Sequence, residues 1–378
     1  MPAKLTLTRR EAHRLRLHAQ LLGVQRGAEV ADTVRSAGAI QAQDRLGEQL
    51  GIGVRSTGLS AADVDHARLA ERTVVRNWLM RGTLHLVPSE DLRWMLELLG
   101  EAMDAKALKR RADLGISDDD HARVLAFLRE ELAANGPMTR AEIGDAFRSA
   151  GLPSDGQATP HLLRTTSLLG VSCFGPERDG DATHTLIDDW IPRSDAPPDP
   201  GAELARRYFT AYGPASQSDF RWWSGLPAAE TRRCLQAALE DLTEVDVDGQ
   251  AMWMSQDALD RLSDVLEGPH GVLRVLGPFD PYIVGYAKRD LDVPDHLLKR
   301  VNAGGGMLRP CVLIDGRLVA TWDRRRRAHG LSVRVTCFEE LSDDARSQLE
   351  AEFDEIGRFL ETEISWSLTL DPAAGRAG

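Results

Sequence analysis

Between residues 117 and 192, the apolar positions first repeat at helical spacing and then alternate as they do in strands. The pattern predicts three helices followed by two strands, at residues 117–134, 139–147, 161–170, 171–174 and 183–188. The first helix opens with capping-type residues, SDDD, and Thr139 can cap the second. Three helices followed by a hairpin is the order of a winged helix, so we expect that domain over residues 117–192.

A similar order recurs after residue 200. Helical segments at 201–212, 216–225 and 228–242 precede a hairpin at 243–255, with Asp248-Gly249 at its turn. We expect a second winged-helix-like unit over residues 200–256. The proline-rich segment 189–201 joins the two units and suits a linker.

The N-terminal region is less regular. Helices are predicted at about residues 8–21, 27–38, 59–71 and 89–115, with short strands at 74–80 and 83–88. We interpret residues 1–116 as a divergent winged-helix-like region.

Strand patterns dominate residues 268–370. Asp315-Gly316 marks a hairpin turn, four arginines (Arg324 to Arg327) fall in a second expected turn, and a helix is predicted at 343–361. The expected fold class is α+β, mainly α, with tandem winged-helix motifs and a C-terminal strand-rich module that ends in a helix.

Composition fits a globular protein, with 378 residues, 42% of them hydrophobic and 28% charged. No apolar run approaches the roughly 20 residues that span a bilayer, and the first residues lack the apolar centre of a signal peptide, so we expect a cytoplasmic protein. The four scattered cysteines are interpreted as small buried hydrophobes. No metal and no cofactor are expected.

The net charge of −12 argues at face value against a nucleic-acid partner. Basic residues nevertheless cluster near the start of the chain, around Lys106 to Arg111, and at Arg324 to Arg327. Each run can be either a solvated face or a DNA contact.

Four segments occur in an order that we recognise: AIQAQD, VVRNWLMRGTLHLVP, FDPYIVGY and RPCVLIDGRLVATW. In order and spacing the chain resembles the AlkZ and YcaQ family of bacterial DNA glycosylases over most of its length. The resemblance implies tandem winged helices and removal of N7-alkylated purines and some interstrand crosslinks from duplex DNA. The family's motif of Gln, any residue, then Gln or Asp falls on Gln41, Ala42 and Gln43.

An uncharged pair suits this chemistry. An N7-alkylguanine is positively charged and leaves as a neutral base, so a strong acid is not needed. Two amides can hold a water and stabilise the positive charge that develops on the sugar. In extended geometry Gln41 and Gln43 share a face, while Asp44 points away. The alternatives are that both glutamines only hydrogen-bond the backbone, or that Asp44 acts as the base.

Other polar residues have both structural and functional interpretations. His85 lies in a predicted strand and is expected to be structural, and Trp222 and Trp223 are expected in the core. Asp280 and Tyr282 could serve either the fold or a cleft. The sequence lacks the motifs of P-loop nucleotide hydrolases and serine esterases.

The expected partner is double-stranded DNA that carries alkylated bases. We expect the protein to bind it as a monomer and to have no membrane partner. Arg324, Arg325, Arg326 and Arg327 are the candidate DNA-binding residues, with a solvated loop as the alternative. Two competing functions remain open: a winged-helix transcription regulator without catalysis, and a protein that sequesters a DNA-alkylating toxin.

Overall fold

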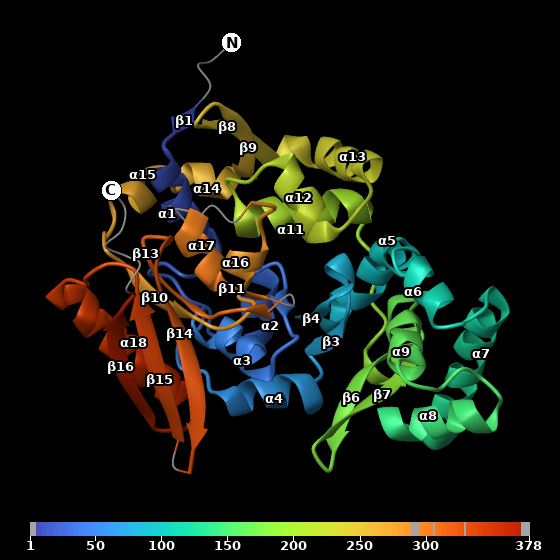
Figure 1. Ribbon diagram of the computed structural model, residues 1–378. Coiled ribbons are helices and arrows are strands. Elements are labelled where there is room, and N and C mark those ends of the chain that lie inside the picture. Colours follow the sequence, from blue (N-terminus) through green and yellow to red (C-terminus); the bar gives the residue numbers. More distant parts are fainter. Residues whose placement is uncertain (1–4, 289–294, 305–306, 329, 372–378) are drawn as a thin grey trace.

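The computed structural model describes residues 5–288, 295–304, 307–328 and 330–371. Helices surround several small sheets, as expected from the mixed pattern of the sequence (Figure 1). The N-terminal elements are β1 (Thr6–Leu7), α1 (Arg9–Ala19), α2 (Val30–Ser36), β2 (Ile40–Gln41), α3 (Arg45–Gly53), α4 (Ala61–Leu69), β3 (Val74–Trp78), η1 (Met80–Gly82), β4 (Leu84–Pro88), η2 (Ser89–Asp91), α5 (Leu92–Ala105) and α6 (Leu108–Asp113).

The N-terminal strands form a three-stranded sheet in the order β2-β4-β3, with β4 antiparallel to both neighbours. The single helix predicted at 89–115 is wrong: it is divided into η2, α5 and α6. Apolar residues on α5 stay buried as far as Met103, and the basic residues that follow have no apolar face to continue the packing. Buried Asp104 accepts hydrogen bonds from Thr165 and Arg111, which turns the chain back.

The middle region has its own hydrophobic core. Its elements are α7 (Asp118–Asn135), β5 (Met138–Thr139), α8 (Arg140–Ser149), α9 (Ala158–Leu168), β6 (Ser172–Arg178), β7 (Asp181–Leu186) and α10 (Ile187–Trp190). Ser117 and Thr139 each close a capping box, which fixes where α7 and α8 begin. The predicted order of three helices and a hairpin is confirmed.

The next region repeats that order, with α11 (Pro200–Tyr212), α12 (Gln217–Ser224), α13 (Ala228–Ala238), η3 (Leu239–Asp241), β8 (Leu242–Val247) and β9 (Gln250–Ser255). Asp248 and Gly249 both have positive φ, 51° and 80°, as the predicted two-residue turn requires. The N-terminal strand β1 pairs with β8 in parallel, so the start of the chain is fastened to this unit.

The C-terminal region contains α14 (Gln256–Asp260), α15 (Leu262–Glu267), β10 (Leu273–Leu276), α16 (Pro281–Val284), α17 (Asp295–Val301), β11 (Asn302–Gly304), β12 (Met307–Leu308), β13 (Cys311–Ile314), β14 (Arg317–Arg327), β15 (Gly330–Cys337), α18 (Asp343–Phe359) and β16 (Ile364–Leu370). Five strands form one sheet in the order β10-β13-β14-β15-β16. This sheet, α18 and the helices α2, α3 and α4 share one core, so the sheet is a fixed support for the N-terminal region.

We predicted that the four arginines lie in a turn, and this is wrong: they lie in β14. Strands β14 and β15 remain paired as far as Arg327 opposite Gly330, so the arginines belong to a long hairpin. In Figure 1 this hairpin and the hairpin β6–β7 point the same way, on either side of α4. None of the described helices is both long and apolar enough to cross a membrane.

Candidate active site

The Gln41–Gln43 pair lies where the short strand β2 leaves its sheet. Gln41 pairs with His85 of β4, and the backbone N–H of Ala42 donates to the carbonyl of Leu84 at 2.8 Å. Ala42 turns its side chain into the core, which leaves the two glutamines on the same side. Gln41 Nε2 donates to Gln43 Oε1 at 2.5 Å. Gln41 is buried and Gln43 is exposed, so the pair joins the interior to the surface.

Arg81 holds the other end of the pair. Its Nη2 donates to Gln41 Oε1 at 2.7 Å, and its Nη1 donates to the carbonyl of Trp223 at 3.0 Å. Arg81 has a φ of 56°, in the left-handed region, and is followed by Gly82 with a φ of 66°. This tight connection between β3 and β4 turns the guanidinium toward β2.

A row of buried polar residues crosses the sheet beside the pair. His85 is opposite Gln41 on one side and opposite Asn77 on the other, so the three side chains share one face. Burial, and then the charge of Arg81, lower the pKa of His85 to about 3, so the imidazole is neutral near pH 7. The contact between His85 Nδ1 and the carbonyl of Thr83, at 3.1 Å, requires the proton on Nδ1. His85 is therefore buried and hydrogen-bonded to the backbone, as a structural histidine would be, and it also borders the pair.

Asp44 is turned away from the glutamines, as the extended geometry predicted. Its Oδ1 accepts from the backbone N–H of Gly47 at 2.8 Å and caps α3. Arg324 of β14 lies 3.2 Å from its other oxygen. Both contacts give Asp44 a structural role.

The next residue, Arg45, connects α3 to the other hairpin. Its guanidinium lies 3.0 Å from Glu177 on β6 and 2.8 Å from Asp65 on α4. Arg68 of α4 also pairs with Glu177, at 2.9 Å. Residues 41–45 thus lie between the hairpins β6–β7 and β14–β15, with one ion pair to each.

Another ion pair lies behind this junction, on the face of the sheet that packs against α3. Glu48 is almost fully buried and lies 3.5 Å from Arg76 of β3. Burial raises the pKa of Glu48, while the charge of Arg76 opposes that rise. Arg76 is on the opposite face from the Gln41 row, because it neighbours Asn77 along the strand.

Three further cations gather near Arg81. Lys106 donates to the carbonyl of Gly225, Arg164 donates to that of Met103 at 3.1 Å, and Arg221 is exposed. Burial, then the charges of Arg221, Arg164 and Arg81, lower the pKa of Lys106. A cluster of cations therefore lies around Arg81 even though the whole chain is acidic.

The four arginines of β14 are exposed. Consecutive strand residues face opposite sides, so only alternate guanidinium groups can face one surface. Arg324 is directed toward Asp44, which follows Gln43 in the sequence.

The structure resolves the remaining alternatives of the sequence. Asp280 is fully buried and pairs with Arg55, and Tyr282 is buried beside it, so both support the fold. Trp223 is in the core as predicted, but Trp222 is not: it is 46% exposed, and its indole N–H donates to the carbonyl of Val284 at 3.2 Å. The four cysteines are buried and free, as expected.

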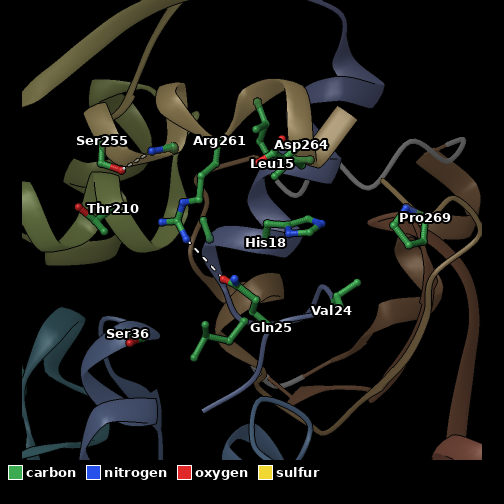
Figure 2. Close-up of a pocket in the computed structure, with 14 residues that line it drawn as sticks. Leu15, His18, Val24, Gln25, Ser36, Thr210, Ser255, Arg261, Asp264 and Pro269 are labelled. Atoms are coloured by element: carbon green, nitrogen blue, oxygen red, sulfur yellow. Dashed lines mark hydrogen bonds between the residues drawn. The ribbon is translucent and has the colours of Figure 1, made fainter. Parts of the chain in front are cut away.

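A hollow of about 500 Å³ lies away from the glutamine pair, among α1, α11, α14 and α15 (Figure 2). Leu15, Val24 and Val265 give it apolar walls, and Arg261 reaches across it to Gln25 at 3.4 Å. Neither Gln41 nor Gln43 lines it. Within the described ranges, no three acidic, histidine or cysteine side chains are placed to hold a metal ion.

Sequence reasoning missed Arg81 and Asn77. The Arg-Gly step between two short strands was a visible turn signal, but it does not show that the guanidinium reaches a glutamine forty positions earlier. Asn77 appeared as one polar residue in a strand, and only the register places it in the row of Gln41.

Comparison with known proteins gives three findings. The model of a protein family described as "DNA glycosylase AlkZ-like" matches residues 34–359. A Streptomyces sahachiroi protein named "Interstrand DNA cross-link repair glycosylase" is 26% identical over 329 residues, which cover 83% of this chain and 87% of that protein. The solved structure of the Streptomyces sahachiroi DNA glycosylase AlkZ superposes with a TM-score of 0.82 at 23% identity, covering 97% of this chain and all of that one.

Proposed function

Because the chain belongs to the AlkZ-like family of DNA glycosylases, we propose that it is a monofunctional glycosylase for N7-alkylated purines in duplex DNA. The proposal extends to bulky adducts and interstrand crosslinks, since the Streptomyces sahachiroi relative is named for crosslink repair. The observation that carries it is the direct contact between Gln41 and Gln43 at a surface flanked by two hairpins. The comparisons give no support to a transcription regulator.

The reaction needs little acid–base chemistry. The cationic base departs as a neutral molecule, and the exposed Gln43 places its amide where it can hold a water and face the sugar as positive charge develops there. Neutral His85 adds no charge to the site at pH 7. The pair offers no amine nucleophile, so the product is an intact strand with an abasic site.

For DNA binding, we propose that residues 117–192 and 200–256 are winged helices and that the N-terminal region is a divergent third unit. The two hairpins would then straddle the duplex, with Arg324 to Arg327 and the cations near Arg81 reaching phosphates. Two observations support this arrangement: the four arginines are exposed, and the two hairpins point the same way (Figure 1). The proposed state is a monomer.

The proposal is tested with oligonucleotides that carry one N7-methylguanine or one N7-linked crosslink, followed by alkali to cut at abasic sites. Wild-type protein should release the base. Gln43→Ala should lower the single-turnover rate by about 10- to 1000-fold with nearly unchanged DNA affinity. Wild-type activity in the double variant Gln41→Ala, Gln43→Ala would exclude the pair as the catalytic centre, and a borohydride-trapped covalent complex would exclude the monofunctional mechanism.

A further inference from the structure

We infer that Arg81 is a positioning residue that sets the direction of both amides in the Gln41–Gln43 pair. The inference rests on the proposed function, because it assigns Arg81 to that same site. It concerns which atoms of Gln43 face the DNA, and not whether the pair is catalytic.

The hydrogen bonds leave one arrangement of the two amides. A guanidinium group only donates, so the Gln41 atom that faces Arg81 must be the carbonyl oxygen. The Gln41 amide nitrogen then faces Gln43, and it also only donates, so the Gln43 atom that meets it must be an oxygen. Arg81 therefore determines the orientation of a glutamine that it does not touch.

This order determines what Gln43 presents outward. One lone pair of Gln43 Oε1 is used by Gln41, and the second is available to a water or to the sugar. Within the described part of the chain, Gln43 Nε2 has no hydrogen-bond partner, so both of its N–H groups can also face the DNA. A cationic donor at the start of such a chain polarises each amide in turn, which strengthens the dipole of Gln43.

The loop that carries Arg81 is built to hold it in place. Its left-handed backbone is packed against Gly225: a Cβ on Gly225 would lie 3.1 Å from the Arg81 backbone nitrogen. The second guanidinium bond, to the carbonyl of Trp223, fixes the plane of the group. Strained backbone that is held by surrounding packing is a common feature of functional sites.

The first test removes the guanidinium. We expect Arg81→Met to lower the single-turnover excision rate by about 10- to 100-fold, the size of one lost electrostatic or orienting group, while Kd for the lesion duplex changes less than about threefold. In the Gln41→Ala background the same substitution should have no further effect, because Arg81 acts through Gln41. If the losses in excision rate of the two single variants instead add up in the double variant, the inference is overturned. Added guanidinium ion should restore part of the Arg81→Met rate, which a purely structural role would not allow.

The second test reverses the amide without removing Arg81. Gln41→Glu keeps an acceptor for the guanidinium but presents an oxygen to Gln43, so Gln43 must turn its N–H groups inward. We expect a fall in excision rate of at least about tenfold with an unchanged melting temperature, the size expected when an oriented electrostatic group is lost. An unchanged rate would show that the direction of Gln43 is irrelevant and would overturn the inference.

Arg72→Met is the matched control. Arg72 also has a positive φ, 58°, and its guanidinium lies over the Trp190 ring at 4.1 Å rather than on the glutamines. The excision rate of Arg72→Met should equal that of wild type, so backbone strain alone is not the cause of any Arg81 effect.

If wild-type protein releases no base, the proposed function fails. If wild type is active and Arg81→Met is equally active, only the role of Arg81 fails.

Discussion

The buried ion pair between Arg55 and Asp280 anchors the helix that follows the glutamine motif. Both side chains are fully buried. Arg55 donates to the two Asp280 oxygens at 2.7 and 2.8 Å, to the Gly51 carbonyl at 2.9 Å and to Gln20 Oε1 at 2.9 Å. Half of these four hydrogen bonds therefore depend on the Asp280 carboxylate, which also neutralises the positive charge of the guanidinium.

We predict that Asp280→Asn lowers the free energy of unfolding by about 3–5 kcal/mol, because it leaves an uncompensated buried charge. The asparagine oxygen can still accept from one guanidinium nitrogen, but its NH2 group faces the other, so one hydrogen bond between charged groups, worth about 1.5–3 kcal/mol, is lost as well. The double variant Arg55→Met, Asp280→Asn should lose clearly less than the sum of the two single variants, since no isolated guanidinium remains.

Urea titration followed by tryptophan fluorescence measures these changes through the shift in midpoint at constant slope. The control is Arg148→Met, which removes an exposed i,i+3 pair with Asp145 and should cost less than about 1 kcal/mol. A loss below about 1 kcal/mol for Asp280→Asn, or additive losses in the double variant, would refute the reasoning from burial.

The other predictions concern the hairpin, the cap and pH. Replacing Arg324 to Arg327 with alanine should weaken DNA binding and reduce its salt dependence by up to about four counterions; an unchanged slope in a salt series would place the arginines away from DNA. Asp44→Asn keeps a good helix cap and should excise within about threefold of wild type, whereas a thousandfold loss would make Asp44 the base. In the folded protein the pKa of His85 is lowered to about 3 and that of His184 to about 4, so both bind fewer protons in the folded than in the unfolded state. Their contribution to the free energy of unfolding is therefore complete above pH 6.5 and is lost as the pH falls toward those values. Melting temperatures from pH 7.5 to 4.5 should therefore fall, and fall less in His184→Leu.

Local signals in the sequence were sufficient for elements that depend on local physics. The capping residues Ser117 and Thr139 mark where α7 and α8 begin, and Asp-Gly pairs mark two hairpin turns. Helix α3 was missed because Gly47, Gly51 and Gly53 lower its helical propensity. Those glycines are needed for packing: a Cβ on Gly47 would lie 2.3 Å from the Pro278 carbonyl oxygen, and one on Gly51 2.9 Å from Ile40.

Most contacts within the site could not be predicted from local patterns, because they join segments that are distant in the sequence. The motif predicted that Gln41 and Gln43 share a face, and the structure places them in contact. Their catalytic role stays a prediction. The run of four arginines resembled a turn because charged clusters are common there, but strand pairing with residues 330–333 extends the hairpin through them. No local pattern could link Arg324 to Asp44, which is 280 positions away.

The position of β2 bears on how a lesion can reach the glutamines. β2 is only two residues long and lies at the edge of its sheet, so the chain leaves the sheet directly at the motif. Gln43 is exposed, and neither glutamine lines the hollow of Figure 2 or four others of 400 to 500 Å³ among the described residues. An enzyme that rotates a base out of the duplex needs a pocket to receive it. A base tied to the opposite strand cannot rotate, so an amide pair whose outer member, Gln43, is exposed between two hairpins suits a substrate whose base stays in the helix.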